Sequence, residues 1–188
     1  MQNPFDTKGL RLVVTKLDPT ETVKSFNCGD DDLNDFILRE SPLYRKEKLA
    51  VTYVLKEIDD TANEHIWAFF SLSNDRISIS DFDSKNKYNR FSRRFNNQKR
   101  LKSYPAAKIG RFGVDDSVKG LSIGSKLLQF IKTYFVDDNK TGCRFITVDA
   151  YAEAIPFYLR NGFVPLNDDD LDGPTRLLYF DLNDLDEN

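Results

Sequence analysis

The chain has 188 residues, of which 40% are hydrophobic and 13% aromatic, and its formal net charge is −3. This length suits one sizeable domain with a core of several strands and helices, and this composition excludes a disordered chain. The small net charge gives no overall attraction to nucleic acid or to an anionic membrane.

Neither disulfides, metal sites nor membrane segments are predicted. The two cysteines, Cys28 and Cys143, form no disulfide framework or metal-binding pattern, and His65 is the only histidine. The start of the chain, MQNPFDTKGL, has no apolar signal core, and the longest uncharged apolar run, 66–72, is too short to cross a bilayer. We expect a cytoplasmic protein that does not contact a membrane.

The first half of the chain predicts a strand, a helical region and a β-hairpin. RLVVTKLD predicts a strand over 11–18, and TETVKSFNCGDDDLNDFILRES after it has helical character. Asp30 to Asp32 are suited to cap its second part, and Pro42 predicts a break before another helical piece, LYRKEKL. The β-branched runs 50–59 and 65–80 flank the turn DDTANE and predict the hairpin.

The second half alternates strands and helices after a polar, basic insertion. The insertion covers residues 81–103 and is expected to be partly helical, with Pro105 ending it. The elements expected after it are a strand over 106–114, a helix over 123–137, a strand over 143–151, a helix over 152–162 and a strand over 175–182. This order predicts one α/β domain with a mixed sheet and helices on both of its faces, and neither a repeat nor a second domain is visible.

Charge is distributed very unevenly along the chain. Residues 84–114 contain ten basic side chains and no acidic one, which leaves 17 basic against 30 acidic residues elsewhere. Within this region, KNKYNRFSRRFNNQKRLK (85–102) also contains Tyr88, Phe91 and Phe95. Aromatic residues between cations are typical of single-strand nucleic-acid binding, but charge runs are more often solvated loops. Both interpretations remain open for this stretch.

The stretch VKGLSIGSKLLQFI (118–131) places two glycines where a helix is about to begin. Gly120 and Gly124 let the backbone approach an anion, and the N–H groups at a helix N-terminus favour negative charge. The stretch matches neither GxxxxGK[ST] nor GxGxxG, so by itself it fits either an anion site or an ordinary turn. Gly113, inside the preceding strand, predicts a bulge or the close approach of another backbone. Coenzyme A, with a diphosphate and an amide-containing arm, would suit both features.

Two blocks of the sequence resemble the GNAT superfamily of acetyltransferases. YPAAKIGRFGVDDSVKGLSIGSKLLQFI is similar to the strand, diphosphate loop and helix of its motif A, and GCRFITVDAYAEAIPFYLRNGFVPL to its second block. FNCGDDDLNDFI resembles the FDCG…LDxFL opening of the toxin-type branch, whose members acetylate aminoacyl-tRNA. The resemblance implies one GNAT-like domain over 1–188, whose mixed, largely antiparallel sheet has a V-shaped splay, with the insertion at about 81–103.

The resemblance also implies where acetyl-CoA would bind as co-substrate. The family loop reads [QR]-x-x-G-x-[GA], where this chain has Lys119 in place of Gln or Arg and Ser122 in place of the first motif glycine. Ser122 could donate a hydroxyl to phosphate or crowd it with its Cβ, so weakened or absent binding remains an alternative. The cofactor residues expected are Phe112, Gly113, Val114, Lys119, Gly120, Leu121, Ser122, Ile123, Gly124 and Ser125.

Acetyl transfer from a thioester to an amine requires a neutral amine, a donor for the oxyanion and a proton for the departing thiolate. Backbone N–H groups of Phe112 to Val114 would stabilise the oxyanion, and the resemblance assigns the general acid to Tyr158. A core role is the alternative for Tyr158. The general base is open between Asp149, Glu153 and a water chain, and we expect His65 and Cys143 to be structural.

We therefore expect an acetyl-CoA-dependent N-acetyltransferase with a primary amine acceptor, the leading candidate being aminoacyl-tRNA. Two alternatives are a degenerate GNAT-fold binding module without catalysis and an enzyme for a small-molecule or protein amine. A tRNA bound through the insertion, a small antitoxin protein and a second copy of the chain are candidate partners. The acceptor-binding residues expected are Arg93, Arg94, Lys99 and Arg100.

Overall fold

The structure is a computed structural model that describes residues 5, 12–57, 65–95, 101–137, 139, 141–168 and 170–185. Seven strands form one sheet in the order β1-β2-β3-β4-β5-β7-β6. The β4–β5 pair is parallel, whereas the β1–β2, β2–β3, β5–β7 and β6–β7 pairs are antiparallel. The mixed, largely antiparallel sheet that the sequence predicts is therefore confirmed.

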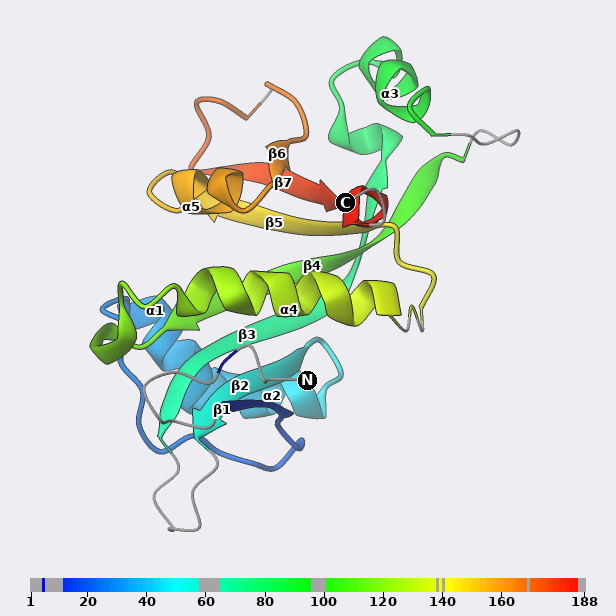
Figure 1. Cartoon of the computed structure of the whole chain (residues 1–188). Coiled ribbons are helices and arrows are strands. Elements are labelled where there is room, and N and C mark those ends of the chain that lie inside the picture. The colour runs from blue at the N-terminus through cyan, green and yellow to red at the C-terminus, as the bar shows by residue number, and fades with distance from the viewer. Residues whose placement is uncertain are drawn as a thin grey trace. The chain divides into compact units, whose positions relative to one another are not determined.

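The elements follow the predicted order closely (Figure 1). The strands are β1 (Leu12–Lys16), β2 (Val51–Glu57), β3 (Ile66–Ser78), β4 (Ser103–Val114), β5 (Phe145–Tyr151), β6 (Val164–Pro165) and β7 (Thr175–Asp181). The α-helices are α1 (Asp31–Asp35), α2 (Ser41–Lys46), α3 (Lys85–Ser92), α4 (Ile123–Asp137) and α5 (Ile155–Arg160). A π-helical segment, η1 (Phe36–Glu40), joins α1 to α2, and three short 3₁₀ segments are η2 (Ile79–Asp81), η3 (Asp116–Val118) and η4 (Leu182–Leu185).

The chain divides into two compact units. The first comprises residues 1–73 and 109–131, and the second comprises 74–108 and 132–188. Strands β3 and β4 and helix α4 each run from one unit into the other. The organisation as one domain and the V-shaped splay of the sheet stay predictions.

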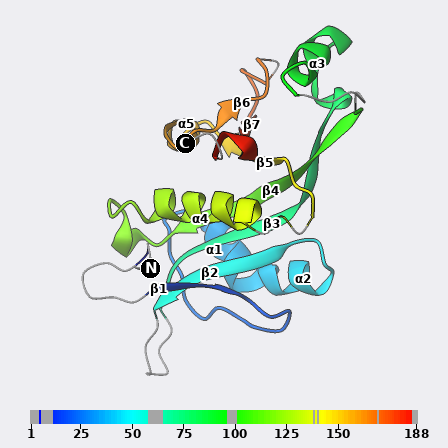
Figure 2. The same cartoon turned by 45° about the vertical axis from the view of Figure 1, so that its right-hand side comes forward.

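In the first unit, helical segments cover both faces of the sheet, because successive residues of β3 point to opposite faces. The ring of Phe69 stacks on Phe36 of η1 at a centroid distance of 6.1 Å. The ring of the next residue, Phe70, lies 6.4 Å from that of Phe130 on α4. Figures 1 and 2 both show α1 and α2 on the side of β2 and β3 that is opposite to α4.

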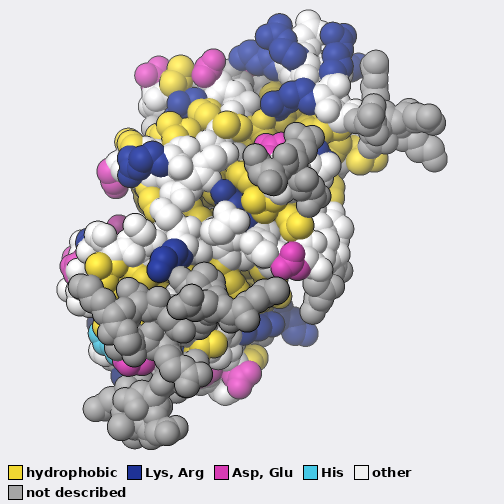
Figure 3. Space-filling model, in the orientation of Figure 1, with side chains coloured by type: hydrophobic (Ala, Val, Ile, Leu, Met, Phe, Trp, Pro, Cys, Tyr) yellow, Lys and Arg dark blue, Asp and Glu magenta, His cyan; other side chains and the backbone are white. Residues whose placement is uncertain are grey.

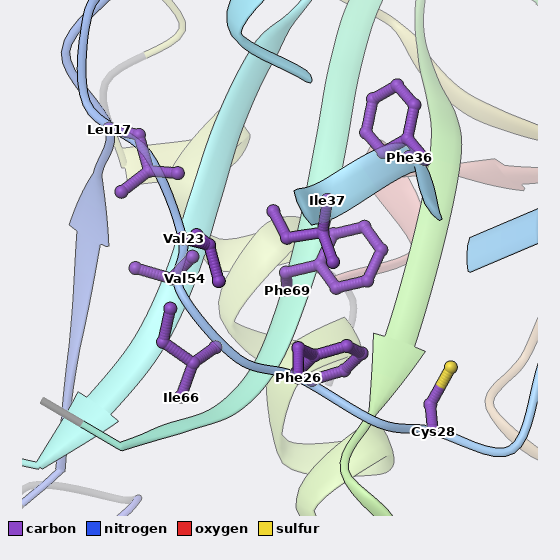
Figure 4. Close-up of a cluster of buried hydrophobic side chains, with 9 residues drawn as sticks. All are labelled: Leu17, Val23, Phe26, Cys28, Phe36, Ile37, Val54, Ile66 and Phe69. Atoms are coloured by element: carbon purple, nitrogen blue, oxygen red, sulfur yellow. The ribbon is translucent and has the colours of Figure 1, made fainter. Parts of the chain in front are cut away.

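A cluster of buried apolar side chains holds the segment before α1 and η1 against β2 and β3 (Figure 4). Phe36 and Ile37 come from the helical region whose apolar spacing the sequence shows, and both are buried. The other members come from β2, β3 and the segment between β1 and α1: Leu17, Val23, Phe26, Cys28, Val54, Ile66 and Phe69.

Three boundaries differ from the predicted ones. Residues 21–29 are irregular, so the helix starts only after Asp30, whose carboxylate accepts a hydrogen bond from the Leu33 N–H at 3.0 Å. The break predicted at Pro42 is wrong: Pro42 lies in the first turn of α2, a position where proline is favoured. Strand β4 begins before Pro105, whose carbonyl still accepts a hydrogen bond from the Arg144 N–H at 2.9 Å.

In the second unit, the alternation of β7 again separates two faces. The ring of Tyr179 lies 5.6 Å from Phe91 of α3, whereas the next ring, Phe180, lies 5.7 Å from Phe163, which follows α5. Helices α3 and α5 therefore pack on opposite faces of this part of the sheet. Helices on both faces of the sheet are thus confirmed within each unit.

Helix α3 forms part of the core of the second unit, although it belongs to the predicted insertion. Tyr88 and Phe91 are buried, and Phe95 packs against the same cluster. The Tyr88 hydroxyl donates to the Leu101 carbonyl at 2.5 Å. The interpretation of these aromatic residues as stacking partners for nucleobases is therefore wrong, because the protein buries Tyr88 and Phe91 against its own rings.

Among the described residues, no helix is both long and apolar enough to span a membrane.

Candidate functional site

Strand β4 leads into the candidate loop through Asp115, which is only 7% exposed. Its N–H donates to the Trp67 carbonyl at 2.9 Å, and its carboxylate accepts from the N–H groups of Ser117 at 3.0 Å and Asn27 at 3.4 Å. Burial alone would raise the pKa of Asp115, but these hydrogen bonds outweigh it and lower that pKa. The role of Asp115 is not predicted above; its one indication in the sequence is a carboxylate directly after a strand.

The loop turns through two residues with left-handed backbone conformations, Gly120 at φ +84° and Ser122 at φ +59°. A Cβ added to Gly120 would meet no atom within 4 Å, so its backbone borders open space. Ser122 adopts a conformation that favours glycine, which costs a residue with a Cβ about 1 kcal/mol. Its carbonyl nonetheless accepts a hydrogen bond from the Lys126 N–H at 3.1 Å at the start of α4.

Helix α4 begins immediately after this turn, at Ile123. The first N–H groups of an α-helix have no partner within the helix and mark the positive end of its dipole. The Ile123 side chain is buried, so it anchors the helix while its backbone remains part of the turn. Open backbone at Gly120 beside a helix N-terminus fits an anion such as a diphosphate. The expected residues 119–125 thus form one continuous stretch, the turn 119–122 and the start of α4 at 123–125.

Lys119, the expected cation of the loop, is paired within the protein. Its Nζ lies 2.5 Å from Asp116 Oδ1 and donates to the Cys28 carbonyl at 3.0 Å. The hydrogen bond with Asp116 raises the pKa of Lys119, so the ammonium stays charged at neutral pH. The Lys119 side chain is 60% exposed, and such a solvated ion pair contributes little to stability. A diphosphate at this loop would compete with Asp116 for the ammonium.

The other expected cofactor residues, Phe112, Gly113 and Val114, end strand β4. A Cβ added to Gly113 would lie 2.6 Å from Cε1 of Phe69. The close approach predicted at Gly113 is therefore present, but it is to an aromatic ring rather than to another backbone. The role of these N–H groups in stabilising an oxyanion stays a prediction.

Tyr158 lies on α5 in the second unit and is 5% exposed. Its ring contacts those of Phe157 and Phe163, at centroid distances of 5.2 and 5.4 Å. Burial raises the pKa of Tyr158 far above its usual value, so the phenol stays protonated at neutral pH, as a general acid requires. The same burial suits a core aromatic residue, and the catalytic role stays a prediction.

The carboxylates considered as general bases differ in their surroundings. Asp149 Oδ2 lies 2.5 Å from Lys108 Nζ, so this carboxylate forms an ion pair within the protein. Glu153 is exposed in the turn before α5. His65 is exposed at the start of β3, where its ring packs edge-on against Trp67 at 4.3 Å.

Basic side chains gather around α3, where Figure 3 shows them in dark blue. Arg93 is exposed at the end of the helix. The Arg94 guanidinium lies 4.9 Å above the Phe91 ring and donates to the Tyr179 hydroxyl at 2.6 Å. The other two acceptor-binding residues expected, Lys99 and Arg100, lie outside the described residues.

A pocket of about 760 Å³ lies beside this basic helix, within the second unit. Its lining includes Arg94, Arg144, Tyr104 and Tyr179, which contribute two guanidinium groups and two phenol rings. Arg144 is paired with Asp181 at 2.8 Å, whereas Arg94 contacts neutral groups, the Tyr179 hydroxyl and the rings of Phe91 and Tyr179.

Both cysteines are buried free thiols. Burial raises the pKa of Cys143 to about 11, and its Sγ donates to the Phe145 carbonyl at 3.0 Å, as expected for inert packing. Within the described part of the chain, no three His, Cys, Asp or Glu side chains are placed to hold a metal ion.

Residues 89–165 match the family model of the acetyltransferase (GNAT) domain. A tyrosine-to-phenylalanine variant of KacT, and AtaT complexed with acetyl-methionyl-tRNAfMet, are each 20% identical, with TM-scores of 0.74 over 94% of this chain and 98% of the other. AtaTR bound with AcCoA is 20% identical, with a TM-score of 0.73 over 94% of this chain and 96% of the other. The resemblance to the GNAT superfamily and the fold of its toxin-type members are confirmed.

Proposed function

We propose that this chain is an acetyl-CoA-dependent N-acetyltransferase that acts on a primary amine, the amino group of an aminoacyl-tRNA. The observation that carries the proposal is the stretch 119–125. In it, Gly120 has a left-handed conformation and open space beside it, and α4 begins three residues later. The stretch lies inside the segment that matches the GNAT domain. The fold shared with AtaT, which is known bound to AcCoA and to acetyl-methionyl-tRNAfMet, supports the choice of co-substrate and acceptor.

The loop and the end of β4 would bind the co-substrate. Acetyl-CoA supplies a thioester as the acetyl donor. The backbone N–H groups of residues 120–125 would hold its diphosphate, and Lys119 would add a positive charge on leaving Asp116. Backbone N–H groups of Phe112 to Val114 would donate to the oxyanion that develops as the amine attacks.

Tyr158 would complete the reaction by donating a proton to the departing thiolate. Its raised pKa supports this role, because the phenol keeps its proton at neutral pH and can donate it to the thiolate. Of the two carboxylates, Glu153 suits the general base better than Asp149, which Lys108 holds.

The basic side chains around α3 would bind the tRNA. Arg93 and Arg94 are exposed there, and the sequence adds Lys99 and Arg100. A structure of AtaT bound to the C-terminus of the antitoxin AtaR supports a small antitoxin as a further partner. A homodimer stays a prediction.

The cofactor loop is tested by calorimetry of acetyl-CoA binding. Gly120→Asp should abolish binding, because it places a carboxylate where the diphosphate would lie. Gly142→Asp is the matched control: Gly142 also has a positive φ, +65°, and open space around a Cβ, so it suffers the same backbone strain away from the loop. Equal affinity in the two variants would show that acetyl-CoA does not bind at this loop.

Turnover tests the role of Tyr158. Tyr158→Phe should lower kcat by roughly 100-fold, as expected for a lost general acid, while the Kd for acetyl-CoA is unchanged. Tyr44→Phe, in the core of the first unit, is the control and should keep full activity. A fully active Tyr158→Phe would return this residue to a packing role.

A second candidate function is a GNAT-fold binding module without catalysis. The pairing of Lys119 with Asp116 and the Cβ of Ser122 in a left-handed position favour it, because both oppose diphosphate binding. Saturable acetyl-CoA binding by the wild-type protein would exclude this candidate, and its absence would establish it over the enzyme.

The salt dependence of binding tests the tRNA acceptor. The logarithm of the affinity for a tRNA acceptor stem should fall steeply with the logarithm of salt concentration, and replacing the four expected acceptor-binding cations by Ser should flatten that slope. These are Arg93, Arg94, Lys99 and Arg100, and the control replaces four cations of the first unit, Lys16, Lys24, Arg39 and Lys46. The absence of tRNA binding at low salt would favour a small-molecule or protein amine.

A further inference from the structure

Lys132 is a buried lysine, 6% exposed, on the apolar face of α4. It lies four residues after Leu128 and next to Ile131, both buried, so it continues the apolar stripe of the helix. A lysine at an apolar position of a helix indicates a buried ammonium, and this indication is not used above. A buried ammonium is unfavourable unless its surroundings compensate for the lost water.

Lys132 belongs to the second unit, and so do the groups that contact its ammonium. Its Nζ donates to the Asn161 carbonyl at 2.5 Å. The same ammonium lies 3.8 Å from the centre of the Phe180 ring and 5.5 Å from that of Phe163, so it also makes cation–π contacts.

Asn161 is the residue that closes α5 after Tyr158. Its backbone N–H donates to the Tyr158 carbonyl at 3.0 Å, and its side-chain amide donates to the Phe157 carbonyl at 2.8 Å. The last carbonyl groups of a helix lack partners and carry the negative end of its dipole. The ammonium of Lys132 therefore compensates the C-terminal end of the helix that holds Tyr158.

Phe163 provides a second connection to the same tyrosine. Its N–H donates to the Tyr158 carbonyl at 3.1 Å, and its ring packs edge-on against the Tyr158 ring at 5.4 Å. Lys132 thus contacts two of the groups that contact Tyr158: the turn at Asn161, which bonds its backbone, and the Phe163 ring, which packs against its side chain.

We infer that Lys132 is a positioning residue for Tyr158: its ammonium holds the C-terminal turn of α5 and the Phe163 ring, and these hold the phenol in one orientation. The inference rests on the proposed function, in which Tyr158 is the general acid. Hydrogen bonds and ring contacts of this kind restrict a side chain to one orientation, and a small misplacement of a catalytic group costs much of the rate.

The charge of Lys132 has a cost that an apolar residue would avoid. Burial lowers its pKa to about 8, which shows that the protonated form is disfavoured inside the protein. Replacing a buried charged group by a well-packed apolar one is often neutral or stabilising. Removing the charge of Lys132 should therefore affect the orientation of Tyr158 without lowering the stability of the fold.

The test compares Lys132→Met in two backgrounds. Methionine is unbranched and only one atom shorter than lysine, and it removes the charge and the donor. We expect kcat to fall roughly tenfold in the wild-type background, with the Kd for acetyl-CoA unchanged, because the general acid is present but misplaced. In the Tyr158→Phe background, Lys132→Met should lower kcat by less than about twofold, since no acid remains to be positioned. Lys46→Met, at an exposed site on α2, is the control for loss of a charge.

The outcomes separate the inference from the proposed function. Equal losses of kcat in both backgrounds, or no loss in either, would overturn the positioning role while leaving Tyr158 as the acid. If Tyr158→Phe itself is fully active, the proposed function fails first. Should Lys132→Met not fold, Phe180→Leu replaces it, because it removes the ring under the ammonium and leaves the Asn161 bond. Its effect on kcat should likewise vanish in the Tyr158→Phe background, and persistence there would overturn the inference.

Discussion

Adding one methyl group at Gly113 should destabilise the protein, because the space beside this glycine is already filled. A Cβ there would lie 2.6 Å from Cε1 and 3.2 Å from Cδ1 of Phe69, and 3.3 Å from Cε1 of Phe26. Phe69 is fully buried, and its ring lies 5.2 Å from that of Phe26 and 6.1 Å from that of Phe36. The ring must therefore shift toward neighbours that cannot easily yield.

The size of the effect follows from two opposing contributions. Overpacking a filled core costs about 1–3 kcal/mol, whereas replacing Gly by Ala gains about 0.4–1 kcal/mol by restricting the unfolded chain. Gly113→Ala should thus lose about 1–2 kcal/mol, which lowers Tm by about 2–4 °C per kcal/mol for a chain of this size. Gly110→Ala, in the same strand, is the matched control, because its Cβ would meet only the rotatable Ser71 Oγ, at 3.2 Å.

Urea unfolding of both variants, with Tm from calorimetry, measures the difference. Gly110→Ala should be as stable as the wild type within about 0.5 kcal/mol, or slightly more stable. Phe69→Leu in the Gly113→Ala background should cost less than Phe69→Leu alone, because the smaller side chain makes room for the methyl group. Equal stabilities of Gly113→Ala and Gly110→Ala would refute the packing argument.

Three further predictions concern the loop and Lys132. Ser122→Gly should change the free energy of unfolding by less than about 1 kcal/mol, because relief of left-handed strain offsets the entropy of glycine, and it should keep or tighten acetyl-CoA binding in calorimetry; a large loss of affinity would show that the Ser122 hydroxyl holds phosphate. Asp116→Asn should tighten acetyl-CoA binding by up to about fivefold, because it frees Lys119 from a solvated ion pair; weaker binding would contradict this account. The pKa of Lys132 is about 8 in the folded protein against 10.5 as its ordinary value, so between these pH values the unfolded chain binds more protons and stability rises with pH. Urea unfolding at several pH values should show that, between pH 8 and 10.5, the free energy of unfolding of the wild type rises by about 3 kcal/mol relative to that of Lys132→Met. A constant difference would mean that Lys132 titrates normally.

Local pattern was enough to predict most of the elements. The helix over 123–137 was predicted to the residue, and the hairpin of β2 and β3 followed from two β-branched runs. These elements depend on apolar periodicity and on turn residues, which neighbouring positions in the chain determine. The two-residue strand β6 escaped prediction, because so short a segment is defined by its pairing with β7 alone.

The candidate loop was also recognisable from the sequence, since its glycines and the helix after them are consecutive. The sequence did not show which groups the charged side chains in and beside this loop would contact. Asp115 is held by the N–H of Asn27, 88 residues earlier, and the Lys119 ammonium donates to the carbonyl of Cys28, 91 residues earlier. Such pairs form only when the fold brings distant segments together.

The tertiary structure alone decided the roles of the aromatic residues in the basic stretch and of Lys132. Tyr88 and Phe91 read as exposed stacking residues in a polar sequence, yet they are buried in the core of the second unit. Lys132 lies on the apolar face of an amphipathic helix, and its ammonium contacts the Asn161 carbonyl and the rings of Phe180 and Phe163. Local sequence determines which face of a helix is apolar, but burial and charge compensation depend on the segments packed against that face, and tertiary packing selects these segments.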